Sequence, residues 1–320
     1  MIPHRMGLIA ALCFLLGCHP PTTADRTSAT DWRTIQQGHQ AIRDATRHHF
    51  QRAAMVLPSE QSDVGDLIWM APLVVQQLGE QADAMAPSDR FGALSVTNSG
   101  RAEVDSDRLT VYLLSSYTPM GERARKQLVY LWFYEPAGPD MPIRWQGFRM
   151  VLNARRFGVL WEVLSADASQ RVFYVSRGLE RAAAERYGPP LSGRRYSVEP
   201  ALDAHPEVVV ARAIGDGPQP MGPFVYLDRA HRITTLACRC DPSQAVAFPQ
   251  SVRYRLVPIA KEAELYGVGL PPSNLRLPSL PDDLGTILRL PAGLLTSDKR
   301  AAESDQSREE ASRPAARRAR

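Results

Sequence analysis

The two thiols of Cys238 and Cys240 are the side chains of this sequence with the most versatile chemistry. One residue, Arg239, separates them, at the end of an expected strand and the start of a turn. Side chains two apart in a strand point the same way, and a disulfide between them requires that the turn has begun. The spacing therefore predicts a local disulfide or a pair of inert thiols.

Thiol exchange and metal ligation are the two alternatives for this pair. Exchange needs nearby positive charge to lower the pKa of a thiol, which Arg232 and Arg239 could supply. Ligation needs further ligands, and the candidates His231, His205 and Met221 stand at no recognised spacing. The sequence predicts neither a metal nor another cofactor.

Familiar catalytic motifs are missing from the sequence. It has no Gly-x-Ser-x-Gly elbow, no His-Glu-x-x-His helix, no Walker loop and no haem-attachment motif. Asp105 with Asp107, and Asp282 with Asp283, lie in polar, loop-like surroundings that are typical of solvated turns. A binding or structural protein is therefore favoured over an enzyme, and no catalytic residue is assigned.

An apolar segment near the N-terminus ends in Leu15-Leu16-Gly17-Cys18. His4 and Arg5 precede it, and the apolar run from Met6 to Leu16 has about half of the roughly 20 residues that a spanning helix needs. This stretch resembles the bacterial lipoprotein signal, with leucine at minus three, a small residue at minus one and the modified cysteine.

The resemblance covers residues 1–18 only, and it implies a location. Residues 1–17 would be a signal peptide, and Cys18 the first mature residue, acylated and anchored in the membrane. His19 stands where family members retained at the inner membrane often carry aspartate, which favours the outer membrane. The resemblance thus implies a lipid-anchored protein of the bacterial cell envelope.

The charge of the chain does not indicate nucleic-acid binding. The formal net charge is +4, but Arg5 lies in the signal, and the terminal residues 298–320 hold seven basic against five acidic side chains. Apart from three lysines, all basic residues are arginines, and no basic helix or basic stripe with interleaved aromatic residues is present.

Two N-terminal helices are expected after a tether at residues 18–30. Asp31 can cap a helix over residues 31–55, in which apolar residues recur at helical spacing. A second helix is expected to begin at Pro72, which suits a first helical position, and residues 67–70 should pack nearby.

From residue 108 the pattern changes to that of strands. Apolar strands are expected at 109–114, 128–134, 146–153, 157–164 and 171–177, with short links that favour antiparallel pairing. A helix at 178–187 is stopped by Gly188-Pro189-Pro190. Further strands are expected at 207–213, 224–228, 232–237 and 252–256.

The C-terminal part of the chain has a different composition. Four Leu-Pro dipeptides between residues 270 and 291 exclude a long helix and predict an extended arm over residues 270–296. This arm either packs on its own domain or uses residues 270–295 to bind another envelope protein. Residues 297–320 lack large apolar side chains and are expected to be disordered.

The sequence as a whole predicts an α+β domain over residues 31–269, with N-terminal helices packed on a largely antiparallel sheet. Its expected role is that of an envelope binding or structural component. The alternatives are a carrier of an apolar ligand, lined by Tyr130, Trp132 and Tyr134, and a thiol or metal protein that uses Cys238 and Cys240.

Overall fold

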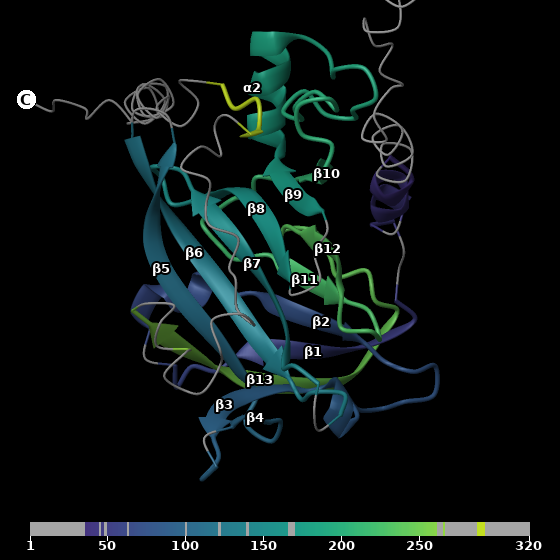
Figure 1. Ribbon diagram of the computed structural model, residues 1–320, viewed down its shortest axis with the longest axis vertical. Helices are drawn as coiled ribbons and strands as arrows, with labels where there is room; N and C mark the ends of the chain where they lie inside the picture. Colours follow the sequence, from purple (N-terminus) through teal and green to yellow (C-terminus); the bar gives the residue numbers. More distant parts are fainter. Residues whose placement is uncertain are drawn as a thin grey trace, which may run out of the picture.

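A computed structural model describes residues 36–44, 46–47, 50–62, 64–99, 101–120, 123–138, 141–165, 170–260, 265 and 287–291. The strands in this part of the chain form one sheet (Figure 1). Its strands are β1 (Arg52–Pro58), β2 (Leu73–Gln77), β3 (Phe91–Val96), β4 (Ala102–Asp105), β5 (Thr110–Met120), β6 (Arg123–Tyr134), β7 (Arg144–Leu152), β8 (Gly158–Ser165), β9 (Arg171–Ser176), β10 (Val208–Ile214), β11 (Phe224–Leu227), β12 (Ile233–Ala237) and β13 (Ala247–Ile259).

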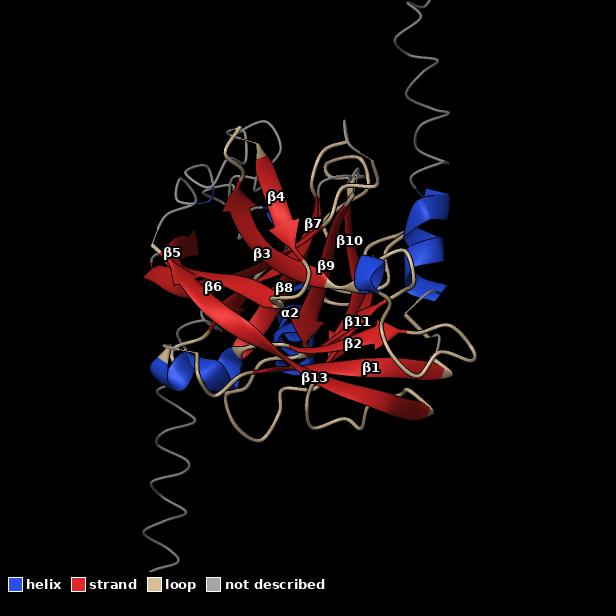
Figure 2. Ribbon diagram, turned by 90° about the horizontal axis from the view of Figure 1, so that it is seen from below, coloured by secondary structure: helices blue, strands red, loops and turns tan. Residues whose placement is uncertain are grey.

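The sheet curls round on itself (Figure 2), and its edge strands β10 and β12 lie close together (Figure 1). The strand order is β10-β9-β8-β7-β6-β5-β13-β1-β2-β11-β12, and the terminal strands β10 and β12 contact each other. Tyr174 of β9 donates a hydrogen bond to the carbonyl of Thr234 across this seam, over 3.3 Å. The hairpin of β3 and β4 branches off through the pairing of β3 with β6. The result is a nearly closed, barrel-like sheet.

Alternating side chains of β6 show how the sequence builds this shape. Leu128, Tyr130, Trp132 and Tyr134 point into the main core, whereas Val129, Leu131 and Phe133 belong to a second cluster on the opposite face. Both faces of the strand are buried. An apolar run without polar alternation is therefore what a strand covered from two sides requires.

The prediction of an α+β fold with helices packed on a sheet is wrong, because the described residues are mostly β and their sheet is nearly closed. Most strand pairs are antiparallel, but four are parallel: β1 with β13, β13 with β5, β2 with β11, and β9 with β10. Within the expected first helix only residues 36–44 are helical among those described, and β1 follows. The expected second helix is the strand β2. Val74 and Val75 favour a strand because β-branched side chains pack well between the neighbouring strands β1 and β11.

The helix α2 (Arg177–Tyr187) lies near its predicted position. Ser176 accepts a hydrogen bond from the backbone N–H of Leu179 and caps the start, and Gly188, with a φ of 81°, ends the helix. Leu179 and Ala183 are buried in a cluster that also holds Leu288.

Residues 287–291 pack on this domain. Leu288 is fully buried beside α2, and the backbone N–H of Arg289 donates to the carbonyl of Val198 over 2.8 Å. The other residues of the expected arm, and the expected tail, lie outside the described residues. The same holds for Cys18 and for the signal and tether around it.

Candidate functional site

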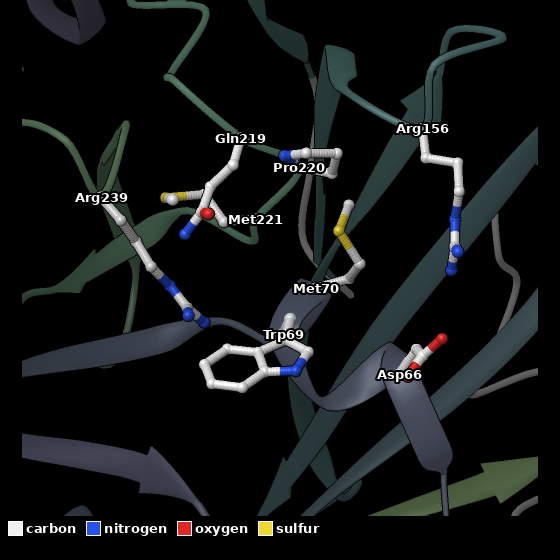
Figure 3. A pocket seen from close by; sticks show the side chains of 8 residues that line it. All are labelled: Asp66, Trp69, Met70, Arg156, Gln219, Pro220, Met221 and Arg239. Carbon is white, nitrogen blue, oxygen red and sulfur yellow. The ribbon is translucent and has the colours of Figure 1, made fainter.

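An open cleft of about 470 Å³ lies beside one end of the sheet (Figure 3). Its lining comes from four separate segments: the 3-10 helix η1 (Gly65–Met70), the turn between β7 and β8, the loop between β10 and β11, and the residue after Cys238. The lining residues are Asp66, Trp69, Met70, Arg156, Gln219, Pro220, Met221 and Arg239.

Glycine and backbone hydrogen bonds hold these segments together. A Cβ atom at Gly222 would lie 2.3 Å from the carbonyl oxygen of Met70, so only glycine permits this approach. The backbone N–H of Gly222 donates to Trp69, and that of Leu73 donates to Pro223, each over 3.0 Å. The loop that carries Gln219 and Met221 is thereby fixed against η1.

Three consecutive backbone carbonyls at the end of η1 accept hydrogen bonds from side chains near the cleft. Tyr130 donates its hydroxyl to the carbonyl of Met70 over 2.8 Å, and Tyr254 donates to that of Pro72 over 2.9 Å. Between them, the guanidinium of Arg239 donates to the carbonyl of Ala71. Burial raises the pKa of both tyrosines, so the hydroxyls stay neutral. The positive charge of Arg239 therefore lies next to neutral groups.

The cation of Arg239 is poorly solvated. Desolvation lowers its pKa, but the guanidinium stays charged because the ordinary pKa of arginine lies far above neutral pH. Its Nε atom is buried without a hydrogen-bond partner, and so is Nε1 of Trp161. Both residues line a second, small pocket of about 10 Å³ together with Cys238. It shares Gln219, Met221 and Arg239 with the cleft, and we term it the inner extension. Both nitrogen atoms are donors, so the inner extension is suited to an acceptor.

The outer part of the cleft is largely apolar and carries a net positive charge. Trp69 is 66% exposed, although residues 67–70 were expected to pack near the predicted second helix. Arg156 stands at the tip of the β7–β8 turn with a φ of 67°, and Figure 3 shows its side chain extending toward Asp66. Two guanidiniums and one carboxylate line the cleft, which leaves one net positive charge.

The cysteine pair adjoins this cleft. The structure joins Cys238 and Cys240 in a disulfide with their Cα atoms 5.2 Å apart. Cys238 is buried and Cys240 is exposed, and the backbone N–H of Cys240 donates to Cys238 Sγ over 3.2 Å. Gly215 and Gly217 lie against the two sulfur atoms.

Of the residues considered as metal ligands, only Met221 lies near the cysteines, because it lines the same inner extension as Cys238. His231 stacks on Tyr134 with ring centroids 4.3 Å apart. It precedes the start of β12, whereas Cys238 follows the end of this strand. His205 lies 3.4 Å from Glu207. Across the part of the chain that the structure describes, no group of three or more His, Cys, Asp or Glu side chains could hold a metal ion.

The structure also bears on the aspartate pairs and on the aromatic residues of β6. Asp105 accepts a hydrogen bond from the backbone N–H of Asp107 over 3.1 Å and forms a turn. Tyr130, Trp132 and Tyr134 are fully buried, and Tyr130 stacks on Phe148 with centroids 5.0 Å apart. These aromatic side chains are core residues, so they do not line a ligand pocket in the described interior. Asp282 and Asp283 lie outside the described residues.

The cleft itself was not predicted from the sequence. In the sequence, Arg239 stands out only as a charge near the thiols, and no motif marks Arg156, Gln219 or Trp69 as part of a site. A weak signal was present in Gly217-Pro218-Gln219-Pro220, since such residues predict an irregular loop rather than a strand. Loops of this kind often carry binding residues.

Comparison of the chain with protein-family models, with curated proteins and with solved structures gives no match. Among the helices in the described ranges, none is long and apolar enough to cross a membrane. The function must therefore be argued from the cleft and from the sequence.

Proposed function

We propose that this chain is a lipid-anchored protein of the bacterial envelope, with the outer membrane favoured, that binds a small amphipathic anion in the Arg239 cleft. The anchor rests on the resemblance of residues 1–18 to a lipoprotein signal. The ligand class rests on the cleft. Its volume of about 470 Å³ lies in the range of small-molecule sites.

The single observation that carries the ligand class is the half-buried guanidinium of Arg239. A desolvated charge is costly unless an opposite charge compensates it. The groups next to Arg239 are neutral: its guanidinium donates to the carbonyl of Ala71, and the hydroxyls of Tyr130 and Tyr254 lie nearby. A carboxylate, sulfate or phosphate oxygen in the inner extension would accept from Arg239 Nε and Trp161 Nε1. Trp69, Met70 and Met221 would contact the apolar part of the same ligand.

A set of probes of equal length tests this proposal. Octanoate, octyl sulfate, octanol and octyltrimethylammonium differ in the charge of the head group, and their binding can be followed by calorimetry. We expect the two anions to bind and the cation to be rejected, because one net positive charge lines the cleft. Octanol should bind more weakly than either anion.

Matched variants locate the binding. Arg239→Gln should lower the affinity for the two anions by roughly ten- to a hundredfold, which is the range that one charged hydrogen bond contributes. The affinity for octanol should stay nearly unchanged. Arg186→Gln, an exposed arginine of α2, is the control and should alter nothing. Equal affinity for octyl sulfate in wild type and Arg239→Gln would place the site elsewhere and overturn the proposal.

A further inference from the structure

The disulfide lies beside the cleft with its two sulfur atoms in unequal environments. Cys240 is exposed, whereas Cys238 is only 7% exposed and lines the inner extension. We infer that Cys238 and Cys240 form a thiol–disulfide exchange site, which a dithiol attacks at Cys240 and whose redox state sets the affinity of the Arg239 cleft. The second half of this inference rests on the proposed function.

Access decides which sulfur is attacked. The loop before β11 approaches Cys238 Sγ more closely than Cys240 Sγ, since a Cβ atom would lie 3.2 Å from the former at Gly217 and 3.5 Å from the latter at Gly215. Cys238 is buried, whereas Cys240 is exposed. Thiol–disulfide exchange needs the attacking sulfur to reach the disulfide, and its rate depends on which sulfur is attacked. Cys240 Sγ is thus the electrophile, and Cys238 is the leaving group.

The surroundings of Cys238 stabilise it as a thiolate. The backbone N–H of Cys240 already donates to Cys238 Sγ over 3.2 Å, and a hydrogen bond to the charged form of a group favours that form. Arg239 lines the same inner extension and adds a positive charge. A thiol with a low pKa leaves faster, so both features favour exchange.

The reaction transfers two electrons from a dithiol to the protein. A thiolate of the dithiol attacks Cys240 Sγ and forms a mixed disulfide, while the bond between Cys238 and Cys240 breaks and its electron pair goes to Cys238 Sγ. The second thiolate of the dithiol then attacks the dithiol sulfur of the mixed disulfide and releases Cys240 as a thiolate. The dithiol leaves as its disulfide, and its two protons pass to the cysteine thiolates.

The bond also constrains the residue between the cysteines. With the Cα atoms of Cys238 and Cys240 held 5.2 Å apart, the backbone of Arg239 is fixed and its guanidinium stays at the carbonyl of Ala71. Reduction removes this restraint, so a bound anion must then order Arg239 at an additional entropic cost. The oxidised protein is therefore the form with the higher affinity for anions.

Reactivity is tested in the full chain by equilibration with mixtures of reduced and oxidised dithiothreitol, alkylation and peptide mass spectrometry. We expect the peptide with residues 238 and 240 to pass reversibly between the oxidised and the doubly alkylated form. Because Cys238 is buried and Cys240 is exposed, oxidised glutathione added to the reduced protein should form its mixed disulfide mainly at Cys240, although Cys238 has the more stable thiolate. A pair that stays oxidised in excess dithiothreitol, or glutathione attached mainly to Cys238, would overturn the exchange site.

Coupling is tested by repeating the titration with saturating octyl sulfate. Binding linkage is reciprocal, so if reduction weakens octyl sulfate severalfold, the ligand must make the disulfide harder to reduce by the same factor. Arg239→Gln is the control, in which the redox state should no longer alter the binding. If reduction of the wild type leaves its affinity for octyl sulfate unchanged, the coupling is overturned. If octyl sulfate does not bind the oxidised protein at all, the proposed function is overturned, and the alkylation experiment alone decides on the exchange site.

Discussion

At the scale of single residues, His39 shows how one buried ring couples the N-terminal helix to the sheet. His39 is 1% exposed, and its Nδ1 atom lies 3.4 Å from Nη1 of Arg194. Because a guanidinium can only donate, Nδ1 accepts and the imidazole is neutral. Burial, followed by the charges of Arg194 and Arg43, lowers the pKa of His39 from 6.5 to about 4.

This lowered pKa predicts that residues 36–44 lose their packing against the rest of the domain in acid. Between pH 6.5 and about 4 the unfolded segment binds a proton that the folded one rejects, so stability falls as the pH falls. The loss is at most about 3 kcal/mol for a shift of this size. In hydrogen exchange, the amides of residues 36–44 should lose protection over this range, while His39→Leu should show no such pH dependence. An identical pH profile in both proteins would contradict this assignment.

At the scale of elements, the sequence predicted β5 to β9 and α2 well because their signals are local. The strands follow one another along the chain through short links, so each pairs antiparallel with the next. The parallel pairs depend on distant segments: Val56 of β1 pairs with Val252 of β13. Nothing within a window around Val56 specifies that partner, and the helical spacing of apolar residues over 31–55 was therefore misleading.

A buried ion triad links three of the well-predicted strands. Glu162 of β8 is 2% exposed and accepts from Arg149 of β7 over 2.6 Å and from Arg171 of β9 over 2.6 Å. Arg149 and Glu162 are direct cross-strand partners. The carboxylate thereby ties β7 to β9 on the outer face of the sheet.

Removing this carboxylate should be costly because buried cations lose their counter-charge. We expect Glu162→Ala to lower the free energy of unfolding by about 3–5 kcal/mol in urea titrations. The control is Arg232→Ala, which breaks the exposed pair with Asp228 and should cost less than about 1 kcal/mol, since the side chain of Arg232 is 74% exposed. Similar small losses in both variants would show that the triad does not stabilise the sheet.

At the scale of the whole molecule, the cleft exists only because four distant segments meet. Asp66, Arg156, Met221 and Arg239 are spread over more than half of the chain, and no motif spacing links them. Sequence analysis could recognise the cysteine pair, whose residues are neighbours, but not the cleft beside it. The curl of the sheet, which depends on the parallel pairs, brings these segments together.

The proposed location of this protein at the membrane depends on Cys18. Cys18→Ser should abolish acylation and release the protein from membranes, because a membrane anchor is expected from no other part of the sequence. Cys13→Ser is the matched control, since Cys13 lies within the expected signal and should be removed with it. Membrane fractionation and intact mass spectrometry of the mature N-terminus measure both effects. An unmodified N-terminus at any residue other than Cys18, or membrane retention of Cys18→Ser, would refute the anchor while leaving the ligand cleft to its own tests.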